Sequence, residues 1–309
     1  MTLAARRLWA GALLVGALAW ALAWLLAGGQ AAPAESAVRA VADVTAAAVL
    51  GFAVLPVLDE PRHRAELVRS AAGPVAVAAV VWLLAEAVRL TLSAAQAADV
   101  VVARLRLHTV AEFTTTIGGR AALLSLTAAA LVCLLALVPT RTRSATRITL
   151  AASAAIGLCA RAVTGHAGDS VVGAAAIVVH ILAAALWCGL LVAIAMTVSH
   201  RGQWARVLPR FSGLALVCVA VLLAAGSTGA LVTVPSVGAL LVTGYGRLLL
   251  AKIVVAAALV VLGWFNRTRW LPAARGHRMD AGQSRRRAQR EVVLMLVALT
   301  LAAALAVAG

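Results

Sequence analysis

Nine apolar runs, each about twenty residues long, dominate this sequence and restrict it to very few folds. Such runs have no polar side to turn toward water, so they are not core helices of a soluble domain. They are continuous rather than alternating, which excludes a transmembrane barrel. The sequence therefore predicts an all-α polytopic membrane protein with about nine transmembrane helices, at about 8–28, 38–58, 72–92, 119–138, 146–162, 171–198, 210–232, 246–265 and 290–308.

The net charge of +16 comes almost entirely from arginine, and its distribution predicts the topology. With a cytoplasmic N-terminus, 19 of the 27 basic residues fall in segments on the cytoplasmic side, as the positive-inside rule requires. We therefore expect the N-terminus inside and the C-terminus outside, with the first run kept as a span. Nucleic acid is not an expected partner. Membrane lipids are, since the basic loop 267–289 would lie near anionic headgroups.

Short similarities between runs that lie four apart predict an internal repeat. Thr116–Arg120 and Thr243–Arg247 both read T-x-x-G-R before a long apolar run, and the run from Asp43 resembles the run from His180. Runs four apart cross the membrane in the same direction, so the repeats would be parallel. The first eight runs would form two four-helix repeats, with the ninth additional. We expect transmembrane halves at 1–145, with about four helices, and 146–309, with about five.

Four polar residues are predicted at a similar depth in the outer half of the membrane. His180 lies about nine residues into the sixth run, or about 13 Å from its outer end. Asp43 and Glu86 lie near the outer ends of the second and third runs, and His166 lies in the outer loop that leads to His180. An imidazole in hydrocarbon is costly and indicates function, and imidazole with carboxylates can bind a transition metal. We therefore predict a metal site made by His180, His166, Asp43 and Glu86.

Structural roles remain open for each of these residues. Arg89 follows Glu86 by three positions on the same helical face, so the two can form an ion pair. His166 can be a solvated loop residue, and Asp43 can hydrogen-bond a neighbouring helix. A packing role for His180 is the hardest of these to accept, because the sequence around it offers no polar neighbour.

Other cofactors and an enzymatic activity are disfavoured. His180 is the one histidine inside an apolar run, so haem with two axial histidines is not expected. The cysteines lack CxxC spacing and are typical of small buried hydrophobic residues; they are Cys133, Cys159, Cys188 and Cys218. Hydrolase and phosphate-loop motifs are absent, which argues against an enzyme.

Four segments resemble the CopD family of bacterial copper-resistance membrane proteins. They are GHAG at 165–168, HILAAALWCGLL at 180–191, PRFSGLAL at 209–216 and YGRLLLAKIVVAAALVVLGWFNR at 245–267. Where family members often have two glycines, this chain has Gly189 followed by Leu190, with Cys188 before them. This departure leaves the helix packing there open and adds a soft sulfur atom.

The resemblance implies a protein of the bacterial cytoplasmic (inner) membrane that transports or binds copper, with His166 and His180 as the copper-handling residues. It also implies a periplasmic CopC-type copper carrier as a partner. The closing segment RREVVLMLVALTLAAALAVAG resembles a junction to a CtaG-like oxidase assembly part, so a CtaG-like domain or an oxidase assembly partner is also expected.

Three functional hypotheses follow. The first is copper uptake from the outer face, with His180 as a ligand, His166 as the first ligand met, and Asp43 and Glu86 as charge or proton partners. The second is a membrane scaffold that docks a copper chaperone or oxidase subunit without transport. The third is proton-coupled transport of an organic solute, with Asp43 and Glu86 as the proton site.

Overall fold

The computed structural model describes residues 3–28, 32–137, 144–162, 171–233, 239–276 and 279–308, and every regular element in these ranges is helical. The long helices are α1 (Leu3–Ala27), α2 (Pro33–Val54), α3 (Arg64–Ala97), α5 (Ile117–Leu137), α6 (Ser144–Ala160), α7 (Val171–Thr197), α8 (Arg201–Thr233), α10 (Gly244–Phe265) and α12 (Ala281–Ala308). Short helices connect them: α4 (Leu107–Thr115), α9 (Ala239–Val242) and α11 (Leu271–Arg275). A π-helical turn, Asn266–Trp270, joins α10 to α11.

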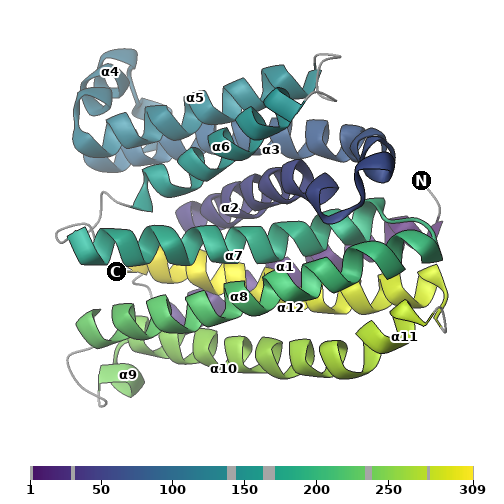
Figure 1. The fold of residues 1–309 in the computed structure, drawn as a ribbon. Helices are drawn as coiled ribbons and strands as arrows, with labels where there is room; N and C mark the ends of the chain where they lie inside the picture. The colour runs from purple at the N-terminus through teal and green to yellow at the C-terminus, as the bar shows by residue number, and fades with distance from the viewer. Residues whose placement is uncertain are drawn as a thin grey trace.

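The long helices correspond to the predicted runs, and the prediction of a polytopic all-α membrane protein is confirmed. Among the described residues, seven helices are long and apolar enough to cross a bilayer, by length and composition. Two apolar segments are shorter, Leu14–Ala27 and Ser144–Ala160. We call the end of the bundle at which α2 and α7 begin the predicted outer end, at the left of Figure 1, and the opposite end the predicted inner end.

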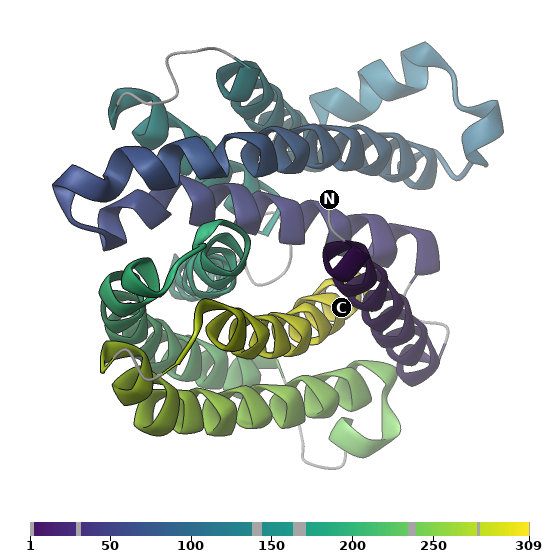
Figure 2. The same ribbon diagram turned by 90° about the vertical axis from the view of Figure 1, so that its right-hand side faces the viewer.

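The helices pack as two groups of four with α1 at the side. Helices α2, α3, α5 and α6 form the first group, and α7, α8, α10 and α12 form the second. Figure 2 shows the first group above the second, with α1 against the second. The sequence expectation made the ninth run the additional helix. In the structure α1 packs mainly on α12 and α10 rather than on the first group. Which helix is additional to the two predicted repeats stays a prediction.

The two T-x-x-G-R segments adopt the same local structure at the predicted outer end. In each, a short helix precedes the threonine, whose Oγ1 accepts a hydrogen bond from the backbone N–H three residues later. The distance is 3.0 Å from Gly119 to Thr116 and 2.9 Å from Gly246 to Thr243. A threonine N-cap of this kind starts the long helix that follows. The sequence similarity thus marks equivalent helix starts in the two groups, α5 and α10.

The two groups meet where α2 crosses α7, and small residues allow their backbones to approach closely. A Cβ atom on Gly51 would collide with the backbone of Gly189, and one on Gly189 would collide with the carbonyl of Ala47. Gly189 is therefore required at this crossing. Leu190, which stands where relatives often have a second glycine, is fully buried in the core.

Candidate metal centre

The structure brings Asp43 and Glu86 into one buried charge network near the predicted outer end. Arg89 Nη1 lies 2.9 Å from Glu86 Oε1 and 3.9 Å from Asp43 Oδ1. Arg39 Nε lies 3.7 Å from Asp43 Oδ2, and Arg161 Nε lies 3.6 Å from Glu86 Oε2. The predicted pairing of Glu86 with Arg89 is confirmed. The depth argument also correctly placed the two carboxylates in one region, and both contact the same guanidinium group.

Glu86 and Arg89, at the centre of this network, are buried. Glu86 is 1% exposed and Arg89 is 6% exposed. The indole N–H of Trp82 also donates to Glu86 Oε1 at 3.3 Å. Within apolar surroundings, each of these charges needs its partner, because an uncompensated buried charge is very costly.

The charge balance of the network does not favour a cation. Three guanidinium groups, from Arg39, Arg89 and Arg161, face the two carboxylates of Asp43 and Glu86. A copper ion would have to displace an arginine from each carboxylate. A direct metal-binding role for Asp43 and Glu86 therefore stays a prediction, and their contacts with arginine favour charge compensation between helices.

His180 lies in different surroundings, on the side of α7 that packs against α8. A Cβ atom on Gly226 of α8 would lie 3.5 Å from Cε1 of the imidazole, so the ring packs over a residue without a side chain. The backbone of Leu222 lies within hydrogen-bonding reach of the ring, but Nδ1 is buried and makes no hydrogen bond of good geometry among the described residues. Among those residues, the charge that acts on His180 is the ammonium group of Lys252 on α10.

The ring nitrogen of His180 is therefore suited to act as a metal ligand. A neutral imidazole offers one nitrogen lone pair, and a buried nitrogen without a hydrogen bond is a lone pair, or a proton, left unsatisfied. His166 lies outside the described residues. Among those described, no group of three or more His, Cys, Asp or Glu side chains is arranged to hold a metal ion. The four-residue site predicted from depth is thus still a prediction.

Two thiols lie deeper in the second group. Cys188 follows His180 by eight residues on α7, or about 12 Å along the helix. Cys188 is 6% exposed and Cys218 on α8 is 4% exposed, and both are free thiols within electrostatic reach of one another. Cysteine sulfur is a soft ligand that suits Cu(I). The prediction that these residues are buried is confirmed.

Sequence reasoning missed a polar pair at the inner end of this group. Glu291 on α12 is 3% exposed and accepts a hydrogen bond of 2.6 Å from the side chain of Asn266. Its charge acts on Cys188. One signal was present in the sequence, because Glu291 is the one acidic residue between Ala281 and Ala308 and stands where the last apolar run begins.

Two family models match most of the chain. The model named Copper resistance protein D-like, N-terminal domain matches residues 30–174, and the model named Copper resistance protein D matches residues 205–305. The chain belongs to the copper resistance protein D family. No curated protein and no solved structure matches it.

The two matched ranges contain some of the site residues and leave others between them. Asp43, Glu86 and His166 lie within the N-terminal match. Cys218 and Glu291 lie within the second match, as does Asn266. His180 and Cys188 fall between the two ranges, so their assignment depends on the chain's own geometry.

Proposed function

We propose that this family member takes copper from the predicted outer face and passes it into the membrane through a site around His180. One observation carries the proposal: the buried, unpartnered Nδ1 of His180 within an apolar helix. Membership of a copper-resistance family supports copper as the ion. His166, in the segment that leads into α7, would be the first ligand met, and His180 the second.

A route toward the predicted inner end would continue through sulfur ligands. Below His180, Cys188 and Cys218 are buried free thiols on facing helices, and Glu291 with Asn266 lies beyond them. Imidazole followed by thiol suits a monovalent copper ion. These groups supply the polar residues that a transport route needs and that a rigid scaffold does not.

In this proposal Asp43 and Glu86 do not bind the ion directly. Their carboxylates balance Arg39, Arg89 and Arg161 and hold α2, α3 and the end of α6 together. A periplasmic CopC-type carrier would deliver copper to the outer face. A CtaG-like or oxidase assembly partner would receive it if delivery rather than import is the outcome.

The test compares cellular copper in cells that express the wild type, His180→Ala or His108→Ala. His108 is an exposed histidine on α4 at the same end of the bundle, so its replacement is a matched control. We expect the wild type and the His108 variant to raise copper per cell, and the His180 variant to leave it at background. Membrane levels of each protein are measured by immunoblot, and purified variants are titrated with Cu(I) against a competing chelator.

Two results would contradict the proposal in different ways. If cells with His180→Ala accumulate as much copper as cells with the wild type, the ion does not bind this histidine on its route. No change of cellular copper with any variant would exclude transport and favour the scaffold. In that case loss of a bound Cu(I) ion in the His180 variant would still locate a binding site.

A further inference from the structure

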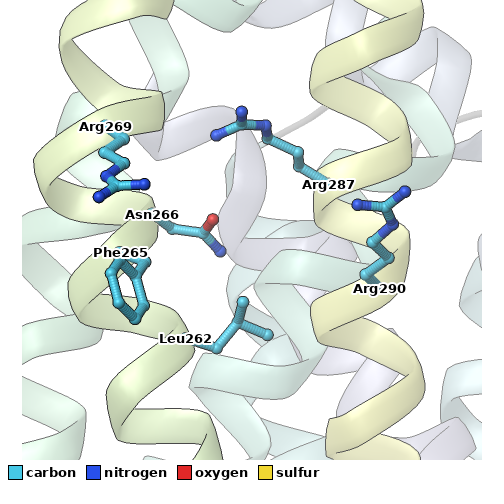
Figure 3. A pocket seen from close by; sticks show the side chains of 6 residues that line it. All are labelled: Leu262, Phe265, Asn266, Arg269, Arg287 and Arg290. Atoms are coloured by element: carbon cyan, nitrogen blue, oxygen red, sulfur yellow. The ribbon is translucent and has the colours of Figure 1, made fainter.

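A basic groove lies between the inner ends of α10 and α12. It has a volume of about 400 Å³ and is lined by Leu262, Phe265, Asn266, Arg269, Arg287 and Arg290. Figure 3 shows the side chains of α10 and of the π-helical turn on one wall and Arg287 and Arg290 on the other. A second hollow of about 390 Å³ shares the three arginines and adds Arg286, so the basic surface extends beyond the groove.

The arginines of this groove have no acidic partner in the part of the chain that the structure describes. No ion pair joins Arg269, Arg286, Arg287 or Arg290 to a carboxylate there. The guanidinium carbon of Arg269 instead lies 5.2 Å from the ring centre of Phe265, which holds it over the groove wall.

The two carboxylates closest in sequence to the arginines of α12 are already engaged. Glu291 accepts the Asn266 amide within the bundle, and Asp280 accepts the backbone N–H of Gln283 at 2.7 Å at the start of α12. Arg287 and Arg290 are three residues apart on one helix, where like charges repel. A cluster of this kind is stabilised when an anion binds between the two helices.

The apolar part of the groove continues along a helix that faces out of the bundle. Leu262 and Phe265 line it, and at the same level of α10 Trp264 (66%) and Val261 (55%) are exposed. This surface belongs to the apolar run of α10, and the arginines stand where that run ends. A ligand that fills both parts has a negative head and long apolar chains.

We propose that the groove binds an anionic phospholipid. Its phosphate would lie between Arg269, Arg287 and Arg290, and an acyl chain would run along Leu262 and Phe265 on α10. Arginine suits this task because its planar guanidinium donates two parallel hydrogen bonds to phosphate oxygens. The proposal does not rest on the copper route, since none of these arginines is placed in that route, although Asn266 lines the groove and also pairs with Glu291.

The experiment uses the full chain purified in a neutral detergent. Native mass spectrometry counts bound lipid after addition of phosphatidylglycerol, and the thermal unfolding midpoint is measured in parallel. Arg287→Gln/Arg290→Gln is compared with Arg69→Gln/Arg201→Gln, which removes two exposed arginines from the same end of the bundle but outside the groove. Further arms replace the lipid by phosphatidylcholine or by inorganic phosphate.

We expect phosphatidylglycerol to bind and to raise the midpoint in the wild type and in the Arg69/Arg201 control. The groove variant should bind it about thirtyfold more weakly, because each of the two arginines that it loses contributes about a fivefold factor to anionic lipid binding. Equal binding by the two double variants would overturn the proposal. Equal stabilisation by phosphatidylcholine would also overturn it, because the ligand would then need no negative charge. Equal stabilisation by inorganic phosphate would overturn it as well, because the ligand would then need no acyl chain.

Discussion

The two four-helix groups each contain a long helix that starts at a threonine N-cap, but they bury different polar chemistry. The first group encloses paired charges, in which Arg89 contacts both Glu86 and Asp43. The second encloses His180, with an unpartnered ring nitrogen, and the free thiols of Cys188 and Cys218. Paired charges need no ligand, whereas an imidazole nitrogen without a well-formed hydrogen bond and soft thiols are suited to bind one. In the proposed function, the first group therefore gives structural support and the second handles the ion.

The largest expected effect is that of Glu86→Gln, which tests whether the first group has a structural role. The change leaves Arg89 and Arg161 in the apolar interior with one carboxylate between them, and breaking a buried ion pair costs about 3 to 5 kcal/mol. The unfolding midpoint in detergent should fall by roughly 10 °C. It can be measured with a thiol-reactive dye, because Cys188 and Cys218 become accessible when the protein unfolds.

The control for this prediction is Glu112→Gln, which neutralises an exposed carboxylate on α4 and should leave the midpoint unchanged. Copper accumulation per folded Glu86→Gln molecule should remain near the wild-type value. If accumulation instead disappears while the midpoint holds, Glu86 belongs to the ion route and the division between the groups is wrong.

Much of the fold could be predicted from the sequence, because a membrane-spanning helix is recognised by the length and composition of its apolar run. The pairing of Glu86 with Arg89 was also predictable, since both stand on one helical face. The equivalent starts of α5 and α10 followed from two threonines that cap their helices in the same way. These features are local, so they do not depend on how the helices pack.

Features that depend on helix rotation could not be predicted. A helix that is apolar all round carries no periodic signal to show which side faces a neighbour. The position of His180 over Gly226 therefore came from the structure, as did the approach of Arg39 and Arg161 to the carboxylates. The placement of α1 beside α12 has the same origin, because packing partners far apart in the chain leave no local pattern.

A second prediction concerns the seam at which the two groups meet. Gly189→Ala places a methyl group against the carbonyl of Ala47, so α2 and α7 must separate. Overpacking of this kind costs about 1 to 3 kcal/mol. The unfolding midpoint should fall, and less protein should be recovered as a monodisperse species by size-exclusion chromatography.

Gly213→Ala on α8 is the matched control, because a Cβ atom there meets no atom within 4 Å. Alanine in place of this helical glycine should stabilise the protein by up to about 1 kcal/mol. The two changes should thus have opposite signs. Equal midpoints for both variants would mean that the groups are not joined through close contact at Gly189.

The smallest predicted effect concerns a second link between the groups, at the predicted inner end. Asp59, between α2 and α3, is fully buried and accepts hydrogen bonds of 2.8 and 3.2 Å from Arg206 on α8. Burial alone would raise the pKa of Asp59, but these bonds and one from the Glu60 backbone N–H hold it below the ordinary value of 3.8. Asp59→Asn should cost about 1 to 2 kcal/mol at pH 7, because Arg206 is partly exposed and regains some hydration.

The pH dependence of this variant separates the charge from the packing. A carboxylate whose pKa is lower in the folded than in the unfolded protein stabilises the fold above the unfolded pKa, and this contribution is lost as the pH falls through the folded pKa. The difference between wild type and Asp59→Asn should therefore be full at neutral pH and shrink below about pH 3.8. Asp99→Asn, an exposed position at the other end of α3, should show no such difference. A gap between wild type and Asp59→Asn that does not change with pH would mean that Asp59 joins the groups by shape rather than by charge.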